Sequence, residues 1–122
     1  VGTSDGVVSD FAIRERLVKY EMNTKSQQIT QRRAIEELEA RAPAFTSSAV
    51  KLTNALNIQA GDEILMDAMG PSGYRWDTES GATEKELEAL RCWLYQKSLT
   101  IAGGTKEIQL NIIAKRVLGL PD

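Results

Sequence analysis

The sequence predicts an all-α protein, an up-and-down bundle of antiparallel helices. Three observations lead to this prediction: apolar residues recur at steps of three and four, connections between the periodic segments are short, and no stretch shows the alternation of a convincing strand. The expected helices cover residues 10–41, 43–69, 84–100 and 105–118. We assign residues 1–8 to a flexible amino-terminal segment and residues 9–122 to one helical domain.

The first helix can be capped by Ser9 or Asp10, both of which are favoured at helix starts. Its inner face follows a helical spacing through Ile13, Leu17, Tyr20, Thr24, Gln27, Gln31, Ala34 and Leu38. The middle of this row is polar, and two interpretations stay open. Either the middle of the helix is solvated and only its ends pack, or it faces a polar partner or the edge of a cofactor.

The second helix follows Pro43, a residue suited to the first helical position. Apolar residues cover more than one of its faces, which is typical of a central helix. One line is Phe45, Ala49, Leu52 and Leu56, and another is Ala55, Ile58, Leu65 and Met69. Gly61 indicates either the close approach of a neighbouring backbone or a small kink. The turn Gly70-Pro71-Ser72-Gly73 ends the helix.

The third helix begins near Thr83 or Glu84, and Leu87, Leu90 and Leu94 form its core line, with Trp93 to one side. The fourth helix opens at Gly104-Thr105 and closes at Gly119. It carries Ile108, Ile112, Ile113 and Val117.

Composition excludes several classes of function. The chain has no histidine and a single cysteine, Cys92, so Ser-His-Asp chemistry, Cys-His chemistry and the usual zinc sites are absent, and we expect no metal site. We expect Cys92 to be a buried packing residue. A lone cysteine cannot form an internal disulfide, which fits a reducing cytoplasm. The net charge of −2 shows no basic stripe for nucleic acid, and no apolar run is long enough to span a membrane.

The turn Gly103-Gly104-Thr105 has a physical interpretation of its own. Two glycines permit backbone shapes closed to other residues and let a ligand approach the main chain. The helix that follows offers unpaired N–H groups, which favour a phosphate or a polarised carbonyl. Taken alone, such a turn is most often a structural cap.

The most specific stretch is residues 98–121, which closely resembles the carboxy-terminal signature of acyl-CoA dehydrogenases. The matching block runs from the glycine turn through Glu107-Ile108-Gln109, Asn111-Ile112-Ile113-Ala114 and Val117-Leu118-Gly119-Leu120-Pro121. The turn that begins at Gly70 also resembles the family's glycine turn at the corresponding place. With both anchors in order, the resemblance covers the chain from about Val8 onward.

The resemblance implies roles for individual residues. Thr105 and Glu107 occupy positions that contact FAD across a subunit interface in the family. Gly104 occupies a position beside the bound acyl chain. Gly70 lies where the family's turn approaches the FAD pyrophosphate.

Three positions depart from the family's pattern. Many acyl-CoA dehydrogenases have a glutamate immediately before the Gly-Thr pair, and that carboxylate removes the α-proton while hydride passes to the flavin. This chain has Gly103 there, which cannot act as a base. Leu110 stands where an arginine is common, and Asp67 stands where relatives often have glutamine. We therefore assign no catalytic residue to this chain.

The resemblance implies further segments, an amino-terminal helical domain and a middle β-domain that cradles the flavin ring, and neither has a counterpart in this sequence. Three hypotheses follow: a domain or fragment of an FAD-dependent acyl-CoA dehydrogenase, a non-catalytic helical interaction module derived from one, or a silent subunit whose base and flavin pocket come from another chain. We expect the chain alone to bind neither FAD nor acyl-CoA productively.

The last expectation concerns partners. Because the central helix is apolar on more than one face, we expect the isolated chain to self-associate, most simply as a dimer. If the line of Leu65 and Met69 makes the contact, substituting either residue with lysine should weaken the dimer.

Overall fold

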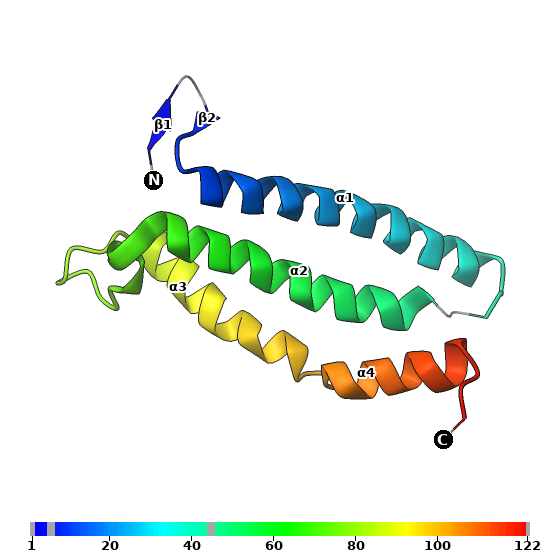
Figure 1. Cartoon of the computed structure of the whole chain (residues 1–122). Coiled ribbons are helices and arrows are strands. Elements are labelled where there is room, and N and C mark those ends of the chain that lie inside the picture. The colour runs from blue at the N-terminus through cyan, green and yellow to red at the C-terminus, as the bar shows by residue number, and fades with distance from the viewer. Residues whose placement is uncertain (1, 5–6, 44–45, 122) are drawn as a thin grey trace.

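The computed structural model describes residues 2–4, 7–43 and 46–121, and it is built mainly from helices, the first three of which alternate in direction (Figure 1). Helix α1 spans Phe11–Glu39, and the central helix α2 spans Thr46–Met69. Helix α3 spans Glu84–Gln96, and α4 spans Lys106–Ile112. Short 3-10 helices follow α2 (Gly70–Tyr74) and α3 (Lys97–Thr100), and a π-helix follows α4 (Ile113–Val117). The predicted all-α class is confirmed.

Helix α2 lies in the middle, with α1 along one side and the row of α3 and α4 along the other (Figure 1). Helix α4 continues in the general direction of α3 after the glycine turn, so the two helices share one flank of α2. The core side chains are small in number, and among the described residues they are Ile13, Ala55, Ile64, Met66, Ala82, Leu87 and Leu90. The prediction that the second helix is central is therefore correct.

The start of α1 is fixed by Asp10, one of the two predicted caps, whose Oδ1 accepts a hydrogen bond from the backbone N–H of Ile13 at 3.1 Å. The predicted inner face holds for most of the helix, because Ile13 and Gln27 are buried. Leu38 departs from it and is 70% exposed. Leu38 follows Glu37, which contacts the first residue of α2, so Leu38 lies past the end of the contact between the two helices.

The polar middle of α1 is joined to α2 by hydrogen bonds. Gln27 is buried, and its Nε2 donates to Oδ1 of Asn54 at 2.7 Å. One turn earlier, Nδ2 of Asn57 donates to the Thr24 hydroxyl at 2.9 Å. The interpretation of a solvated middle is therefore wrong. The polar partner is the second helix of the same chain, because each buried amide needs a hydrogen-bond partner to offset its loss of water.

Gly61, on α2, lies against the ring of Tyr20 from α1. A Cβ at this position would lie 2.9 Å from Cε2 of Tyr20, so any larger residue would push the tyrosine ring away. The expected close approach is present, but it is made by a side chain and not by a backbone.

The connection from α1 to α2 differs from prediction. Helix α2 begins at Thr46, so Pro43 does not occupy its first turn; Phe45 lies outside the described residues. The carboxylate of Glu37 fixes the start, because it accepts hydrogen bonds from the Thr46 hydroxyl at 2.6 Å and the Thr46 N–H at 3.2 Å. The Thr46 hydroxyl is also the main reason that the pKa of Glu37 is lowered. Arg41 has a φ of 52°, which turns the chain out of α1.

The amino-terminal segment contains a short antiparallel pair, β1 (Thr3–Ser4) with β2 (Val7–Val8). Ser9, which lies between β2 and α1, closes this pair, because its N–H and its hydroxyl both donate to the Gly2 carbonyl. The prediction of no strand is wrong here. Two residues per strand are too few to show the alternation by which strands are identified in a sequence.

Helix α3 starts as predicted, with a capping box in which Thr83 and Glu86 satisfy each other's backbone N–H groups. Leu87 and Leu90 are buried, whereas Leu94, the third residue of the predicted core line, is 44% exposed. Cys92 is exposed, so its predicted packing role is wrong. It lies on the solvent side of a helix whose buried positions are taken by the two leucines.

Trp93 joins α3 to α2. Its Nε1 donates to Oε1 of Glu63 at 3.0 Å, and the same oxygen accepts a hydrogen bond from Lys97. These two donors, Lys97 first, lower the pKa of Glu63. The rings of Tyr74 and Trp93 meet edge to face, with their centroids 6.0 Å apart. The indole of Trp93, which lies to one side of the predicted core line, thus holds α3 against α2.

Candidate functional site

The turn before α4 is a left-handed backbone segment. Gly103 has a φ of 69° and Gly104 a φ of 101°, conformations that L side chains adopt with strain. Thr105 then caps α4, and its hydroxyl accepts from the N–H of Ile108. The predicted double-glycine turn is therefore present, and its backbone shape explains why both residues are glycine.

Two side chains hold this turn from the inside. Nε2 of Gln109, which is buried, donates to the Gly103 carbonyl at 2.9 Å. Nζ of Lys51, on α2, donates to the Gly104 carbonyl. The turn is thereby tied both to its own helix and to the central helix.

Gly104 is required by the fold itself. A Cβ there would lie 2.9 Å from Nε2 of Gln109 and 3.3 Å from Cγ2 of Ile108. The space beside Gly104 is thus filled by residues of the same chain. A Cβ on Gly103, by contrast, would meet only Cε of Lys51, at 3.7 Å, and Gly103 is exposed.

Glu107 lies on the exposed first turn of α4. The pKa of its carboxyl is lowered because its own backbone N–H and the Thr105 hydroxyl hydrogen-bond to the carboxylate. The Thr105 hydroxyl therefore connects the carboxylate to the helix start. The pair presents one hydroxyl and one ionised carboxylate next to the glycine turn.

Gly70 begins the second glycine turn, with a φ of 60° and no atom within 4 Å of the place where a Cβ would be. The Ser72 hydroxyl donates to the Met69 carbonyl and satisfies the end of α2. Gly73 is buried against Met66 and Met69. The backbone at Gly70 is thus open to close approach, whereas Gly73 serves packing.

The structure brings Gly103, Gly104, Thr105 and Glu107 together but leaves Gly70 apart from them. Lys51, which holds the first turn, precedes Gly70 by nineteen residues of α2, or roughly 28 Å at 1.5 Å per residue. In Figure 1 the Gly70 turn lies at the carboxyl end of α2, whereas the 103–105 turn, between α3 and α4, lies partway along α2. The two glycine turns are therefore separate sites on the surface of this domain.

Two of the three positions that depart from the family's pattern, Asp67 and Gly103, make contacts in this fold. Asp67 forms an ion pair with Arg16 and so joins the end of α2 to the first turns of α1. Leu110 is on α4 and largely exposed. Gly103 offers a backbone carbonyl to Gln109 and no acidic group.

Lys51 and Gln109 were not identified as site residues from the sequence. Gln109 belongs to the motif that carries the resemblance, so the motif could have identified it as a site residue. Lys51 is 53 positions from the carbonyl that it binds, and nothing in its neighbourhood indicates that contact. In the part of the chain that the structure describes, no three His, Cys, Asp or Glu side chains are placed to hold a metal ion. None of the helices described there is long and apolar enough to cross a bilayer.

The chain is thus an all-α domain with a central helix and two glycine turns, one of which is followed by Thr105 and Glu107. The family model "Acyl-CoA dehydrogenase, C-terminal domain" matches residues 3–118, so the chain belongs to the acyl-CoA dehydrogenase family.

Relatives with the same family name match the chain over most of its length. It is 35% identical over 116 residues to acyl-CoA dehydrogenase IpdE1 of Mycolicibacterium smegmatis, covering 95% of this chain and 27% of the relative. It is 32% identical over 113 residues to acyl-CoA dehydrogenase FadE34 of Mycobacterium tuberculosis, covering 92% of this chain and 14% of the relative. The chain thus spans about a quarter or less of these relatives' length. No solved structure matches the chain significantly.

Proposed function

We propose that the chain acts as the carboxy-terminal helical domain of an FAD-dependent acyl-CoA dehydrogenase in lipid metabolism. The complete enzyme would oxidise an acyl-CoA thioester between Cα and Cβ, with FAD supplying the acceptor for hydride. The observation that carries this proposal is the turn at 103–105, where a backbone shape that favours glycine leads into the half-buried Thr105 and the exposed Glu107. Cys92, which cannot form an internal disulfide, supports a cytoplasmic location.

The chain would contribute two edges to FAD sites. Thr105 and Glu107 offer a hydroxyl and a carboxylate for hydrogen bonds, and the open space beside Gly70 suits the approach of a pyrophosphate. Gly104 would border the acyl chain through its backbone. Because Lys51, which holds the 103–105 turn, lies roughly 28 Å from Gly70 along α2, we expect one copy of the chain not to surround a cofactor by itself.

The isolated chain should therefore not retain FAD and should not oxidise acyl-CoA. Only separate edges of a cofactor site are present, and Gly103 provides no base for α-proton removal. Equilibrium dialysis with FAD, and dye reduction with an acyl-CoA, are the measurements. A yellow, stoichiometric flavoprotein that reduces the dye would contradict the prediction.

A chimera tests the proposed role. The carboxy-terminal segment of the Mycolicibacterium smegmatis relative is replaced by this chain, and flavin content is compared among the chimera, the intact relative and the relative without that segment. We expect the chimera to hold more flavin than the truncated protein, and Thr105→Val with Glu107→Ala to reduce that content. A folded chimera with no more flavin than the truncated protein would argue against the proposal.

The alternative function, a non-catalytic module or silent subunit, is favoured by one observation: Gly103 carries no carboxylate. The chimera separates the two possibilities. Flavin content without acyl-CoA oxidation would favour the silent subunit, whereas restored oxidation would show that the base comes from elsewhere.

Self-association is the second part of the proposal. Large apolar side chains are exposed on α1 and, at Leu65, on α2, and soluble monomers seldom leave extended apolar patches uncovered. We expect sedimentation velocity at tens of micromolar to show a dimer. Leu65→Lys and Val18→Lys variants would tell which face makes the contact, because Met69 is half-buried beside Gly73. A clean 13.5 kDa monomer would contradict the expectation.

A further inference from the structure

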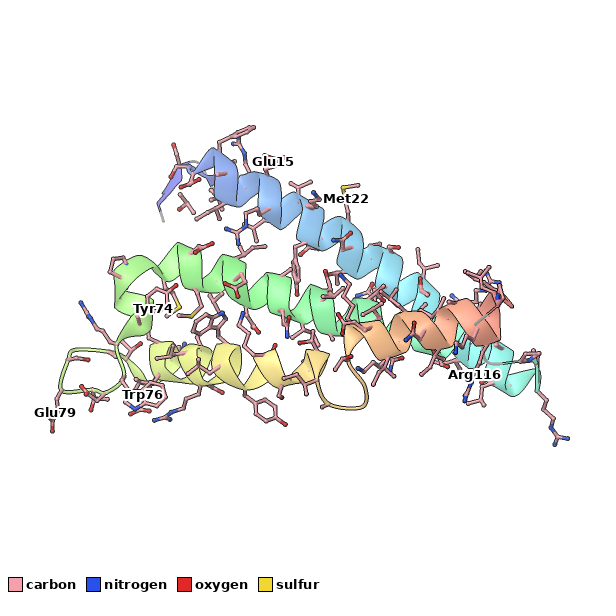
Figure 2. The ribbon with its side chains drawn as sticks, turned by 60° about the horizontal axis from the view of Figure 1, so that its bottom comes forward. Glu15, Met22, Tyr74, Trp76, Glu79 and Arg116 are labelled. Carbon is pink, nitrogen blue, oxygen red and sulfur yellow. The ribbon has the colours of Figure 1, made fainter. Side chains whose placement is uncertain are left out.

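The face of α1 that points away from α2 carries an exposed apolar stripe. Glu15 and Met22 lie on this outer side of the helix in Figure 2. Four apolar side chains, each 56–68% exposed, belong to it: Phe11, Val18, Met22 and Ile29. From Phe11 to Ile29 the stripe is about 27 Å long at 1.5 Å per residue.

The spacing along this stripe is that of a coiled-coil seam. Steps of four and three lead from Phe11 through Glu15, Val18, Met22 and Lys25 to Ile29. The two charged members, Glu15 and Lys25, are also exposed. Residues of the polar row that bonds to α2, such as Gln27, lie on the opposite side of the helix. The outer seam is therefore separate from the packing of the chain on itself.

We propose that this stripe pairs with the same stripe of a second copy, with the two α1 helices antiparallel. The six positions are symmetric about the level of Tyr20. In the antiparallel pair, Phe11 therefore meets Ile29 of the second copy, and Val18 meets its Met22. Glu15 meets Lys25 of the second copy, once on each side of the two-fold axis. The inference rests on the proposed self-association and assigns its surface.

Charge decides the direction of the pair. In a parallel pair, Glu15 would face Glu15 and Lys25 would face Lys25, whereas the antiparallel pair turns both contacts into opposite charges. The same arrangement limits the affinity. Lys19 and Glu21, which are both exposed, flank the seam on its two sides. Near the two-fold axis, Lys19 would lie close to Lys19 of the second copy, and Glu21 close to its Glu21, so like charges would repel on both sides.

Cross-linking tests the direction. Each variant is made in a Cys92→Ser background, because Cys92 is exposed. A mixture of Phe11→Cys and Ile29→Cys chains should form a covalent dimer with a short bifunctional thiol reagent. Phe11→Cys chains alone should not, since their thiols would lie about 27 Å apart. Efficient cross-linking of Phe11→Cys alone would overturn the antiparallel arrangement.

Charge reversal tests the contact itself by sedimentation equilibrium. Glu15→Lys and Lys25→Glu should each weaken the dimer about tenfold, since two exposed pairs per dimer change from attraction to repulsion. The double variant should return to within about twofold of the unmodified chain. Glu39→Lys, at the end of α1, is the matched control and should have no effect. A dimer that neither reversal weakens would overturn this surface and leave self-association standing, whereas a monomeric unmodified chain would overturn both.

Discussion

Replacing Gly104 with alanine should lower the free energy of unfolding by about 2–3 kcal/mol. The residue has a φ of 101°, and a Cβ there would lie 2.9 Å from Nε2 of Gln109. The new methyl group would therefore strain the backbone and disturb the amide that holds the Gly103 carbonyl. Urea unfolding followed by far-ultraviolet circular dichroism measures the loss.

The matched control is Gly70→Ala. Gly70 also has a positive φ, 60°, but no atom lies within 4 Å of its potential Cβ, so only the backbone cost of about 1 kcal/mol should appear. In a Gln109→Ala background, Gly104→Ala should likewise cost less, because the crowding has been removed. Equal losses at Gly104 and Gly70 in the otherwise unmodified chain would show that the Gln109 contact does not matter.

The second large effect is expected at the amide pair between α1 and α2. Gln27→Leu alone should destabilise the chain by about 2 kcal/mol, because it leaves the part-buried Oδ1 of Asn54 without its donor. Asn54→Leu should do the same to Gln27. The double leucine variant should lose much less than the sum of the two, since neither side then contains an unpaired amide.

Thermal and urea unfolding of the four proteins completes this double-mutant cycle. Gln28→Leu, at an exposed neighbouring position, is the control and should change stability by less than about 0.5 kcal/mol. Strictly additive losses would mean that Gln27 and Asn54 act independently, contrary to their hydrogen bond.

Features coded by adjacent residues could be predicted from the sequence. The caps at Asp10, Thr83 and Thr105 bond within three residues of themselves, and the periodic faces need only a window of a few turns. The double-glycine turn belongs to the same group, because its shape is a property of the glycines.

Features that depend on distant partners could not be predicted. The donor from Lys51 to Gly104 and the amide pair of Gln27 with Asn54 join different helices, and a polar residue in a helical row gives no sign of which group will meet it. Cys92 shows a different limit. Free cysteines are usually buried, but the position of this one on α3 is set by Leu87 and Leu90, which take the inner face.

The central position of α2 has a consequence for how the chain opens. Helix α1 packs chiefly on one flank of α2, and α3 and α4 pack on the other. Contacts between α1 and the carboxy-terminal helices are therefore largely indirect and pass through α2. Such a layout favours sub-global opening, in which α1 detaches while the carboxy-terminal half keeps its contacts. The Glu37–Thr46 and Arg16–Asp67 links then act as clasps at the two ends of α1. The glycine turn, tied to α2 by Lys51, belongs to the half that such an opening leaves intact.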